Sequence, residues 1–390
     1  MLKTDILAKV LHHIYFVPGL FGFARLASYD YFAHVRSALQ ARFRDAGQQI
    51  ETHAVDVLPT ASVRRRAAKL AALIDRTSGG KGPIHLVGHS TGGLDARLAA
   101  SPSTTLPIPA RVMRWLPRLR SVTTMNTPHY GTPLASFLVT SNGQRLLSAL
   151  SAFTLGGLSL GAHPLGAAGA LIGLIGRGDD ALGIKLRILD KSVGLLLGLV
   201  KDARRPDVLA YINAVKEDQG SMLQISPEAM DLTVAGFRDR PGVAYQSTAS
   251  MAPTPSPGKW VRTLGHPWRA ASLALFTALH GITSRHDDRY PCAAARAGRR
   301  TEVMLARALG FVPDRSANDG VVPIRSQLWG TLVWAGLGDH LDVLGHYRDD
   351  RKGRLATLRH RDWLTSGSSF DSTNFGALMD AVTNGMLKSV

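Results

Sequence analysis

The sequence predicts an α/β fold, in which a mostly parallel sheet is flanked by helices. Between residues 14 and 125, short apolar runs alternate with stretches whose apolar residues recur every three to four positions. Strands that alternate with helices in this way form parallel sheets covered on both faces. Glycines close several of the helical stretches, as they commonly do at helix C-termini. One strand-to-helix junction also contains a serine between glycines, which predicts a sharp turn there.

Each element is predicted from its local pattern, in chain order. The predicted strands cover 14–17, 49–57, 84–87, 119–125 and 243–247, and a further apolar run covers 332–337. The predicted helices cover 30–46, 63–74, 93–100 and 375–387. Gly47 is expected to end the first helix, and Thr373 or Asn374 is expected to cap the last. The Pro/Ser-rich stretch 251–259 is expected to be a loop.

Composition and length indicate a globular chain. Of 390 residues, 45% are hydrophobic and 19% are charged, which does not suggest disorder. We expect a single domain over 1–390. The only cysteine, Cys292, excludes an intramolecular disulfide and is interpreted as an ordinary thiol. Lys9, His12 and His13 interrupt any signal-like apolar stretch, so no Sec signal peptide is predicted. A cytoplasmic or peripherally membrane-associated protein is expected, with non-Sec export left open.

The most informative segment is Gly88-His89-Ser90-Thr91-Gly92, which has the pattern G-x-S-x-G. It follows the apolar run 84–87 and leads into the helical pattern 93–100, so it occupies a strand–turn–helix junction. A serine in such a turn has a strained backbone that lifts its hydroxyl above the sheet. The flanking glycines allow neighbouring backbone to come close. The sequence therefore predicts Ser90 as a nucleophile, with an ordinary glycine-rich turn as the alternative.

A serine nucleophile needs a base to accept its proton and a carboxylate to orient that base. Two late turns offer these groups. Asp319 lies in the turn Asn318-Asp319-Gly320, and His340 lies in a polar loop after the apolar run 332–337. Asn-Asp-Gly is also a common turn for backbone reasons alone, and His340 has the alternative of an ordinary surface histidine. The rival bases are His89, His129, His346 and His360, with His346 as the fallback.

The oxyanion of an acyl-transfer intermediate requires two backbone N–H donors. Thr91, which follows the nucleophile, is expected to supply one. Leu20 is expected to supply the other, from the loop after the first strand, because Gly19 and Gly22 allow that loop to approach the serine. A plain glycine turn is the alternative interpretation of this loop.

The pattern changes after Pro133. We expect an inserted apolar lid or cap over 134–240 and a second insert of uncertain structure over 252–300. The stretch 155–176 contains no charged residue and is long enough to cross a bilayer. His163, Pro164 and frequent glycines interrupt it, however, which favours an apolar cap over a transmembrane span.

Taken together, the motifs resemble the bacterial triacylglycerol lipases of the α/β-hydrolase superfamily, the Pseudomonas and Burkholderia type. The resemblance covers most of the chain in patches, at 17–22, 87–93, 126–133, 225–230, 318–320 and 340–342. It implies an α/β-hydrolase fold with a lid after Pro133. It also implies Ser90, Asp319 and His340 as the catalytic triad and Leu20 with Thr91 as the oxyanion hole.

The chain departs from that family at several positions. Pro18 stands where the family usually has a histidine that braces the oxyanion loop. The family binds a structural calcium ion near the catalytic histidine, and Asp342 matches one ligand position. His346 replaces the usual glutamine and is a poor ligand for a hard cation. Asp287 or Asp288 would serve only if the second insert folds back. The family's disulfide and signal peptide have no counterpart in this sequence.

These features predict a carboxylic-ester hydrolase that works through an acyl-enzyme and requires no cofactor for its chemistry. The apolar cap favours long-chain acyl esters as substrates, so a lipase is the first hypothesis. A phospholipase or an intracellular polyester hydrolase acting at membranes is the second. A non-catalytic, membrane-associated binding protein on the same scaffold is the alternative from another class.

The net charge of +17 bears on partners. The basic residues are scattered, with concentrations at 64–66, 285–315 and 348–361. Solvated faces are the simplest interpretation, and peripheral contact with an anionic membrane is the second. Aromatic residues are not interleaved with the arginines and no nucleic-acid motif accompanies them, so nucleic acid is not expected as a partner.

Overall fold

A six-stranded, fully parallel sheet forms the centre of the molecule. The computed structural model describes residues 10–20, 25–26, 29–58, 60–140, 143, 220–261, 263, 265–349, 360 and 362–390. The strand order is β4-β1-β5-β6-β7-β8. These strands are β1 (Leu11–Val17), β4 (Gln49–Ala54), β5 (Ile84–His89), β6 (Leu119–Met125), β7 (Ala244–Met251) and β8 (Thr331–Leu337). Two short strands, β2 (Arg25–Leu26) and β3 (Tyr29–Asp30), pair separately.

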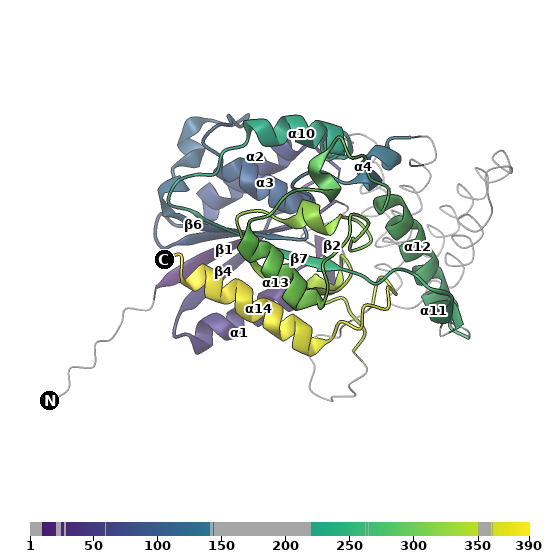
Figure 1. Ribbon diagram of the computed structural model, residues 1–390. Helices are drawn as coiled ribbons and strands as arrows, with labels where there is room; N and C mark the ends of the chain where they lie inside the picture. Colours follow the sequence, from purple (N-terminus) through teal and green to yellow (C-terminus); the bar gives the residue numbers. More distant parts are fainter. Residues whose placement is uncertain are drawn as a thin grey trace, which may run out of the picture.

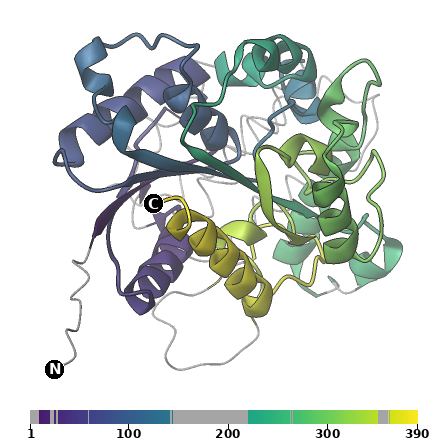
Figure 2. The same cartoon turned by 60° about the vertical axis from the view of Figure 1, so that its left-hand side comes forward.

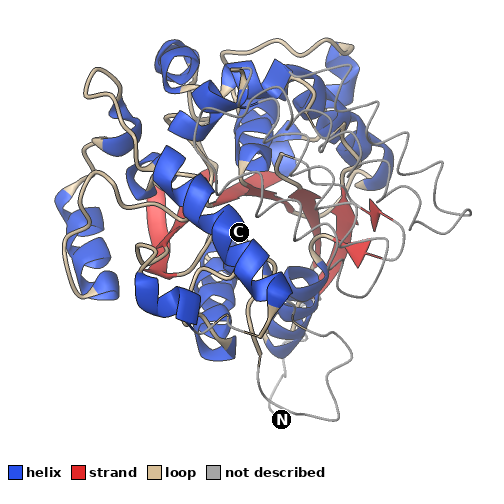
Figure 3. Cartoon of the chain, turned by 90° about the vertical axis from the view of Figure 1, so that its right-hand side faces the viewer, coloured by secondary structure: helices blue, strands red, loops and turns tan. Residues whose placement is uncertain are grey.

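Helices cover both faces of the sheet, which confirms the predicted fold class (Figure 1). On one face lie α2 (Val63–Thr77) and α3 (Thr91–Ala100). On the other, α1 (Ala33–Asp45) and α14 (Ser372–Leu387) lie side by side (Figure 2). The twisted sheet runs between these two helical layers (Figure 3).

Strand β1 shows how the sequence builds two cores at once. Its residues from His12 to Val17 are all buried. Side chains of a strand alternate between the two faces of the sheet. Accordingly, Ile14 and Phe16 pack in the core under α1 and α14, whereas Tyr15 and Val17 pack in the core under α2. This explains why its second half, 14–17, is a continuous apolar run and not an alternating one.

The other described helices belong to the segments that connect the strands. They are α4 (Pro133–Leu138), α9 (Gly220–Gln224), α10 (Pro227–Gly236), α11 (Pro257–Val261), α12 (Pro267–Thr283) and α13 (Arg299–Leu309). Short 3₁₀ helices are η1 (Ala110–Met113), η2 (Leu116–Arg118), η4 (Pro291–Ala293), η5 (Ile324–Gln327) and η6 (Asp342–Leu344). Among all the residues that the structure describes, no helix is long and apolar enough to span a bilayer.

The two predicted inserts differ in how much of them the structure describes. Most of the predicted lid, 134–240, falls in 144–219, which lie outside the described residues, and so does the uncharged stretch 155–176. The second predicted insert, 252–300, contains α11, α12, η4 and the first residues of α13.

Two local expectations are corrected by the structure. Helix α14 begins at Ser372 and is capped by Asp371, not by Thr373 or Asn374. The Asp371 carboxylate accepts the Thr373 and Asn374 amides at 2.8 and 3.0 Å, and Asn374 Oδ1 accepts the Asp371 amide at 3.2 Å. This reciprocal capping box satisfies more donors than a cap at either later residue would. The expected loop 251–259 ends in α11, which begins at Pro257.

Candidate active site

Ser90 lies in the turn between β5 and α3 with a strained backbone. Its φ is +55° and its ψ is −131°, a region that residues with a side chain rarely occupy. The glycines on either side are required by close packing. A Cβ on Gly88 would lie 2.3 Å from the Gly92 carbonyl oxygen, and one on Gly92 would lie 2.1 Å from the Val17 carbonyl oxygen. The turn therefore has the tight strand–helix geometry that the sequence predicted.

The loop after β1 lies against this turn. A Cβ on Gly19 would lie 2.6 Å from Ser90 Cβ and 3.2 Å from Ser90 Oγ, so only a glycine fits there. Leu20 is the next residue of the same loop. Thr91 is the first residue of α3, and the first amides of a helix have no partner within the helix. The structure thus places Thr91 and the loop that carries Leu20 beside Ser90.

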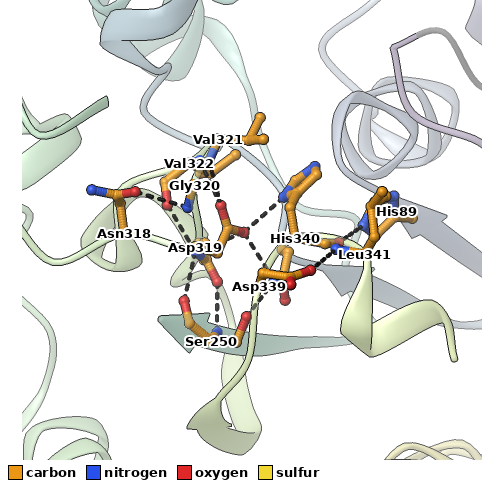
Figure 4. Close-up of polar contacts among 12 residues, drawn as sticks. His89, Ser250, Asn318, Asp319, Gly320, Val321, Val322, Asp339, His340 and Leu341 are labelled. Carbon is orange, nitrogen blue, oxygen red and sulfur yellow. Dashed lines mark hydrogen bonds and ion pairs between the residues drawn. The ribbon is translucent and has the colours of Figure 1, made fainter. Parts of the chain in front are cut away.

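His340 and Asp319 are joined by a short hydrogen bond. His340 Nδ1 lies 2.7 Å from Asp319 Oδ2, and the His340 amide donates to the Asp319 carbonyl at 2.9 Å (Figure 4). Because Nδ1 donates its proton to the carboxylate, Nε2 of the neutral ring is left as the atom that can accept one. His340 follows β8, and its side chain is 7% exposed.

The Asp319 carboxylate is fully buried and is surrounded by donors. Its Oδ1 accepts the backbone amides of Val321 and Val322 at 2.9 and 2.7 Å. Its Oδ2 accepts Asn126 Nδ2 at 2.9 Å and Gln327 Nε2 at 3.3 Å, in addition to His340. Hydrogen bonds from several directions fix the orientation of the carboxylate. Asp319 is thereby held in place to orient an imidazole.

A backbone contact brings Asp319 to the end of β7, although 67 residues separate Met251 from Asp319 along the chain. The Ala252 amide donates to the Asn318 carbonyl at 2.9 Å, which closes the excursion between the two. Helix α12 supports the returning chain, since Asn318 Nδ2 donates to Ser284 Oγ at 3.0 Å and Thr283 Oγ1 donates to the Gly320 carbonyl at 3.2 Å.

His89 connects the Ser90 turn to the His340 loop. His89 Nε2 donates to the His340 carbonyl at 2.8 Å, and the two rings lie 4.6 Å apart between centroids. Ser90 and His340 are both among the described residues, and they make no hydrogen bond to each other. Bonds between a nucleophile and its base often tighten only when substrate binds. Asp319 and His340 are thus already paired, and His89 links their loop to the turn that contains Ser90.

The rival histidines have structural partners instead. Burial holds the pKa of His89 and of His129 well below 6.5. Arg97 Nη1 donates to His129 Nδ1 at 2.9 Å, and Trp329 stacks on the His129 ring. Burial also lowers the pKa of His346 to about 3. His360 Nδ1 donates to the Gly345 carbonyl at 2.7 Å.

Arg66 is a site residue that the sequence analysis missed. It belongs to the arginine run 64–66, for which solvated faces were expected, yet it is 1% exposed. Its guanidinium donates to Asp95 Oδ2 at 2.8 Å and to the Leu58 carbonyl at 3.2 Å, and it also bonds the Pro18 carbonyl. Pro18 begins the loop that carries Leu20, and Asp95 lies on α3, the helix that follows Ser90. Arg66 thus braces that loop against α3.

The sequence analysis also missed Asn126 and Gln327, whose side chains hold the Asp319 carboxylate. Asn126 follows β6 and has a φ of +49°, and its Nδ2 donates to both Asp319 and Ser250 Oγ, the latter at 2.6 Å. Gln327 ties the Asp319 turn to β7, because its side chain exchanges two hydrogen bonds with the Ser250 backbone at 2.8 and 3.0 Å. Sequence spacing gave no signal for either contact, since both depend on tertiary placement.

Asp342, the predicted calcium ligand, already has hydrogen-bond partners. Asp342 Oδ2 already accepts the Asp339 amide at 2.9 Å and the Ser368 hydroxyl at 2.7 Å. The adjoining cavity of about 370 Å³ is lined by carboxylates and cations alike, namely Asp342, Asp362, Asp371, Lys259, Arg269 and Arg348. Calcium prefers six to eight oxygen ligands. Asp287 and Asp288 are engaged by Arg289 and Arg315. Calcium binding stays a prediction, and no step below relies on it.

Comparisons with known proteins give the fold. No protein-family model matches the sequence, and no curated protein matches it. Among solved structures, a Staphylococcus hyicus lipase aligns with a TM-score of 0.52 at 14% identity, covering 97% of this chain and 96% of that chain. The chain has the α/β-hydrolase fold. EstA from Clostridium botulinum aligns at 18% identity with a TM-score of 0.48, and the alignment covers 94% of this chain and 87% of the EstA chain.

Proposed function

We propose that this α/β-hydrolase-fold protein is a serine-dependent carboxylic-ester hydrolase, and that a lipase acting on long-chain acyl esters is its most specific description. The observation that carries the proposal is the 2.7 Å bond between Asp319 Oδ2 and His340 Nδ1, at the sheet edge where Ser90 occupies a strained turn. Buried carboxylate, oriented imidazole and strained serine are the three parts of an activated nucleophile. The Staphylococcus hyicus protein with a similar fold is a lipase, which agrees with this chemistry.

The mechanism assigns one role to each residue. Ser90 Oγ attacks the ester carbonyl while His340 Nε2 takes its proton, and Asp319 stabilises the imidazolium that forms. The Leu20 and Thr91 amides stabilise the tetrahedral oxyanion, a contribution of about 3 kcal/mol for each donor. His340 then protonates the leaving alcohol, which gives an acyl-Ser90 intermediate. Water, activated by His340, attacks that intermediate and releases the acid.

The first test replaces the nucleophile. Ser90→Ala is expected to abolish turnover of a p-nitrophenyl acyl ester without changing the thermal unfolding temperature, because it removes only the attacking oxygen. Ser103→Ala, which removes an exposed hydroxyl away from this turn, is the matched control and is expected to keep full activity. A Ser90→Ala protein as active as the parent would exclude the proposal.

Labelling separates the enzyme from a non-catalytic scaffold. A fluorophosphonate probe reacts only with a serine made nucleophilic by its base, so the parent protein is expected to be labelled at Ser90 and the Ser90→Ala variant is not. A correctly folded parent that fails to react would favour the membrane-associated binding protein.

Acyl length and head group are assigned from the sequence alone. The uncharged stretch 155–176 favours apolar acyl chains. We expect faster hydrolysis of a long-chain triglyceride emulsion than of a short p-nitrophenyl ester. Phospholipid vesicles and a polyester film test the second hypothesis, and adding a chelator to each assay tests calcium dependence. A preference for phospholipid or polyester would replace the lipase description while leaving the ester-hydrolase proposal intact.

A further inference from the structure

Three residues with metal-binding side chains meet on strands β1 and β4, away from the Ser90 turn. His13 on β1 is the register partner of Glu51 on β4. His53 follows Glu51 by two residues, and residues two apart on a strand project from the same face. The two strands are neighbours and β4 is at the edge of the sheet. The parallel register therefore places all three side chains together.

Their ligand atoms are spaced as they would be around one small cation. His13 Nδ1 lies 3.5 Å from Glu51 Oε2, and His53 Nε2 lies 3.2 Å from Glu51 Oε1. The three ligand atoms lie within 4.8 Å of one another. Zinc–nitrogen bonds of about 2.0 Å in tetrahedral geometry set neighbouring ligand atoms about 3.3 Å apart. The two nitrogen–oxygen distances, each to a different oxygen of the carboxylate, are close to that value.

Two of these nitrogen atoms are buried and make no hydrogen bond. They are His13 Nδ1 and His53 Nε2, which are the atoms aimed at Glu51. His13 as a whole is 4% exposed. A buried polar atom without a partner costs free energy, and native structures seldom leave one without a reason. A bound cation would satisfy both nitrogens at once.

The ring of His53 is held by a neighbouring aromatic side chain. Tyr15 stacks on the His53 ring at 5.1 Å, which restricts the orientation of that ring.

We propose that His13, Glu51 and His53 form a binding site for a divalent first-row transition metal ion of the zinc type. Two imidazoles and one carboxylate suit zinc, cobalt, nickel or copper, whereas calcium and magnesium prefer oxygen ligands only. In the parts of the chain that the structure describes, this is the one cluster of three such side chains with ligating distances. The side chain of Glu51 is 47% exposed, so the remaining coordination position faces solvent.

The site is structural in this proposal and separate from ester hydrolysis. His13 precedes Val17 by four residues, about 13 Å along an extended strand, and the oxyanion loop begins only after Val17. A metal ion bridging β1 and β4 would fasten the edge strand β4 to the sheet. Edge strands have exposed backbone groups and are the strands most prone to separate or mispair.

The test uses the full-length protein without a histidine tag, stripped with chelator and desalted. Isothermal titration with zinc chloride is expected to show one zinc ion per chain, together with a rise in unfolding temperature. Cobalt at the same site is expected to give the visible absorption bands of a four-coordinate ion. Glu51→Gln keeps the shape of the side chain, and His53→Gln replaces the ring by a neutral polar side chain. Each is expected to weaken zinc binding at least tenfold.

Matched controls make each outcome decisive. His286→Gln changes a histidine whose Nε2 lies 3.7 Å from an oxygen of Asp288, a pair without a third ligand, and it is expected to leave the affinity unchanged. The rate of ester hydrolysis is expected to be the same in all three variants, so failure here is distinguishable from failure of the proposed function. Absence of zinc binding by the parent, or parent-like affinity in both Glu51→Gln and His53→Gln, would overturn the proposal.

Discussion

Arg66 shows how a single buried charge can hold a loop in place. Its guanidinium joins the Pro18 carbonyl to Asp95 on α3, so it ties the loop after β1 to the helix that begins after Ser90. Both partners in the ion pair are almost completely buried, with exposures of 1% and 0%. Removing one member of such a pair leaves an uncompensated charge in the interior.

Replacing Arg66 by Met is expected to reduce kcat on a p-nitrophenyl ester at least tenfold, because the Leu20 amide loses its fixed position. KM is expected to change little. The free energy of unfolding is expected to fall by about 3 kcal/mol, the cost of an unpaired buried carboxylate. Arg65→Met, at an exposed neighbour in the same run, is the control for both measurements. Unchanged kcat in Arg66→Met would show that the loop does not depend on this brace.

The buried imidazole of His85 is expected to make the free energy of unfolding depend on pH. Its ring lies in the sheet between His12 and Ser121, with hydrogen bonds of 3.0 and 2.7 Å. Burial lowers its pKa to about 3 from 6.5. Between these values the unfolded chain binds a proton that the folded chain does not, so folding is favoured above pH 6.5 and loses stability as the pH falls.

A variant without this titration tests the effect. In His85→Asn, the loss of unfolding free energy between pH 7 and pH 5 is expected to be about 2 kcal/mol smaller than in the parent, since one pKa unit corresponds to about 1.4 kcal/mol. Denaturant unfolding at the two pH values measures it. His286→Asn, at an exposed ring, is expected to keep the parent's pH dependence. An identical dependence in His85→Asn and the parent would contradict the predicted linkage.

At the scale of elements, the contact between the oxyanion loop and the Ser90 turn makes the sharpest prediction. Gly19→Ala would place a methyl group 2.6 Å from Ser90 Cβ, so the loop must move away from the nucleophile. We expect kcat to fall at least tenfold. The largest fall expected is the one that follows the loss of one oxyanion donor. Gly258→Ala, where an added Cβ meets nothing within 4 Å, is expected to keep full activity. A kcat in Gly19→Ala equal to that of the parent would show that Leu20 is not part of the oxyanion hole.

The sequence was most informative where an element depends on its own residues. Strand β6 has the predicted bounds, and α1 ends just before Gly47, whose φ is +73°. The predicted N-cap of α14 was wrong because several polar residues in this segment can cap a helix. Asp371 is the cap, and it forms reciprocal hydrogen bonds with Asn374. Arg66 could not be predicted as buried, since its partners Pro18 and Asp95 lie far from it along the chain.

At the scale of the whole molecule, the net charge of +17 predicts salt-sensitive membrane contact. Each Lys or Arg near an anionic surface contributes about 1 kcal/mol of attraction, within a Debye length. We expect the protein to sediment with vesicles that contain phosphatidylglycerol and not with pure phosphatidylcholine vesicles. High salt is expected to release it. Equal binding to both vesicles at every ionic strength would show that charge does not drive the contact.

The excursion between β7 and Asp319 also bears on how this fold can be altered. Its two ends are adjacent through the bond from Ala252 to Asn318, so its length does not determine where the acid lies. Yet α12, inside the excursion, holds the turn that contains the acid through Thr283 and Ser284. A chimera that replaces this segment would therefore keep its activity only if the graft brings its own support for Asn318 and Gly320.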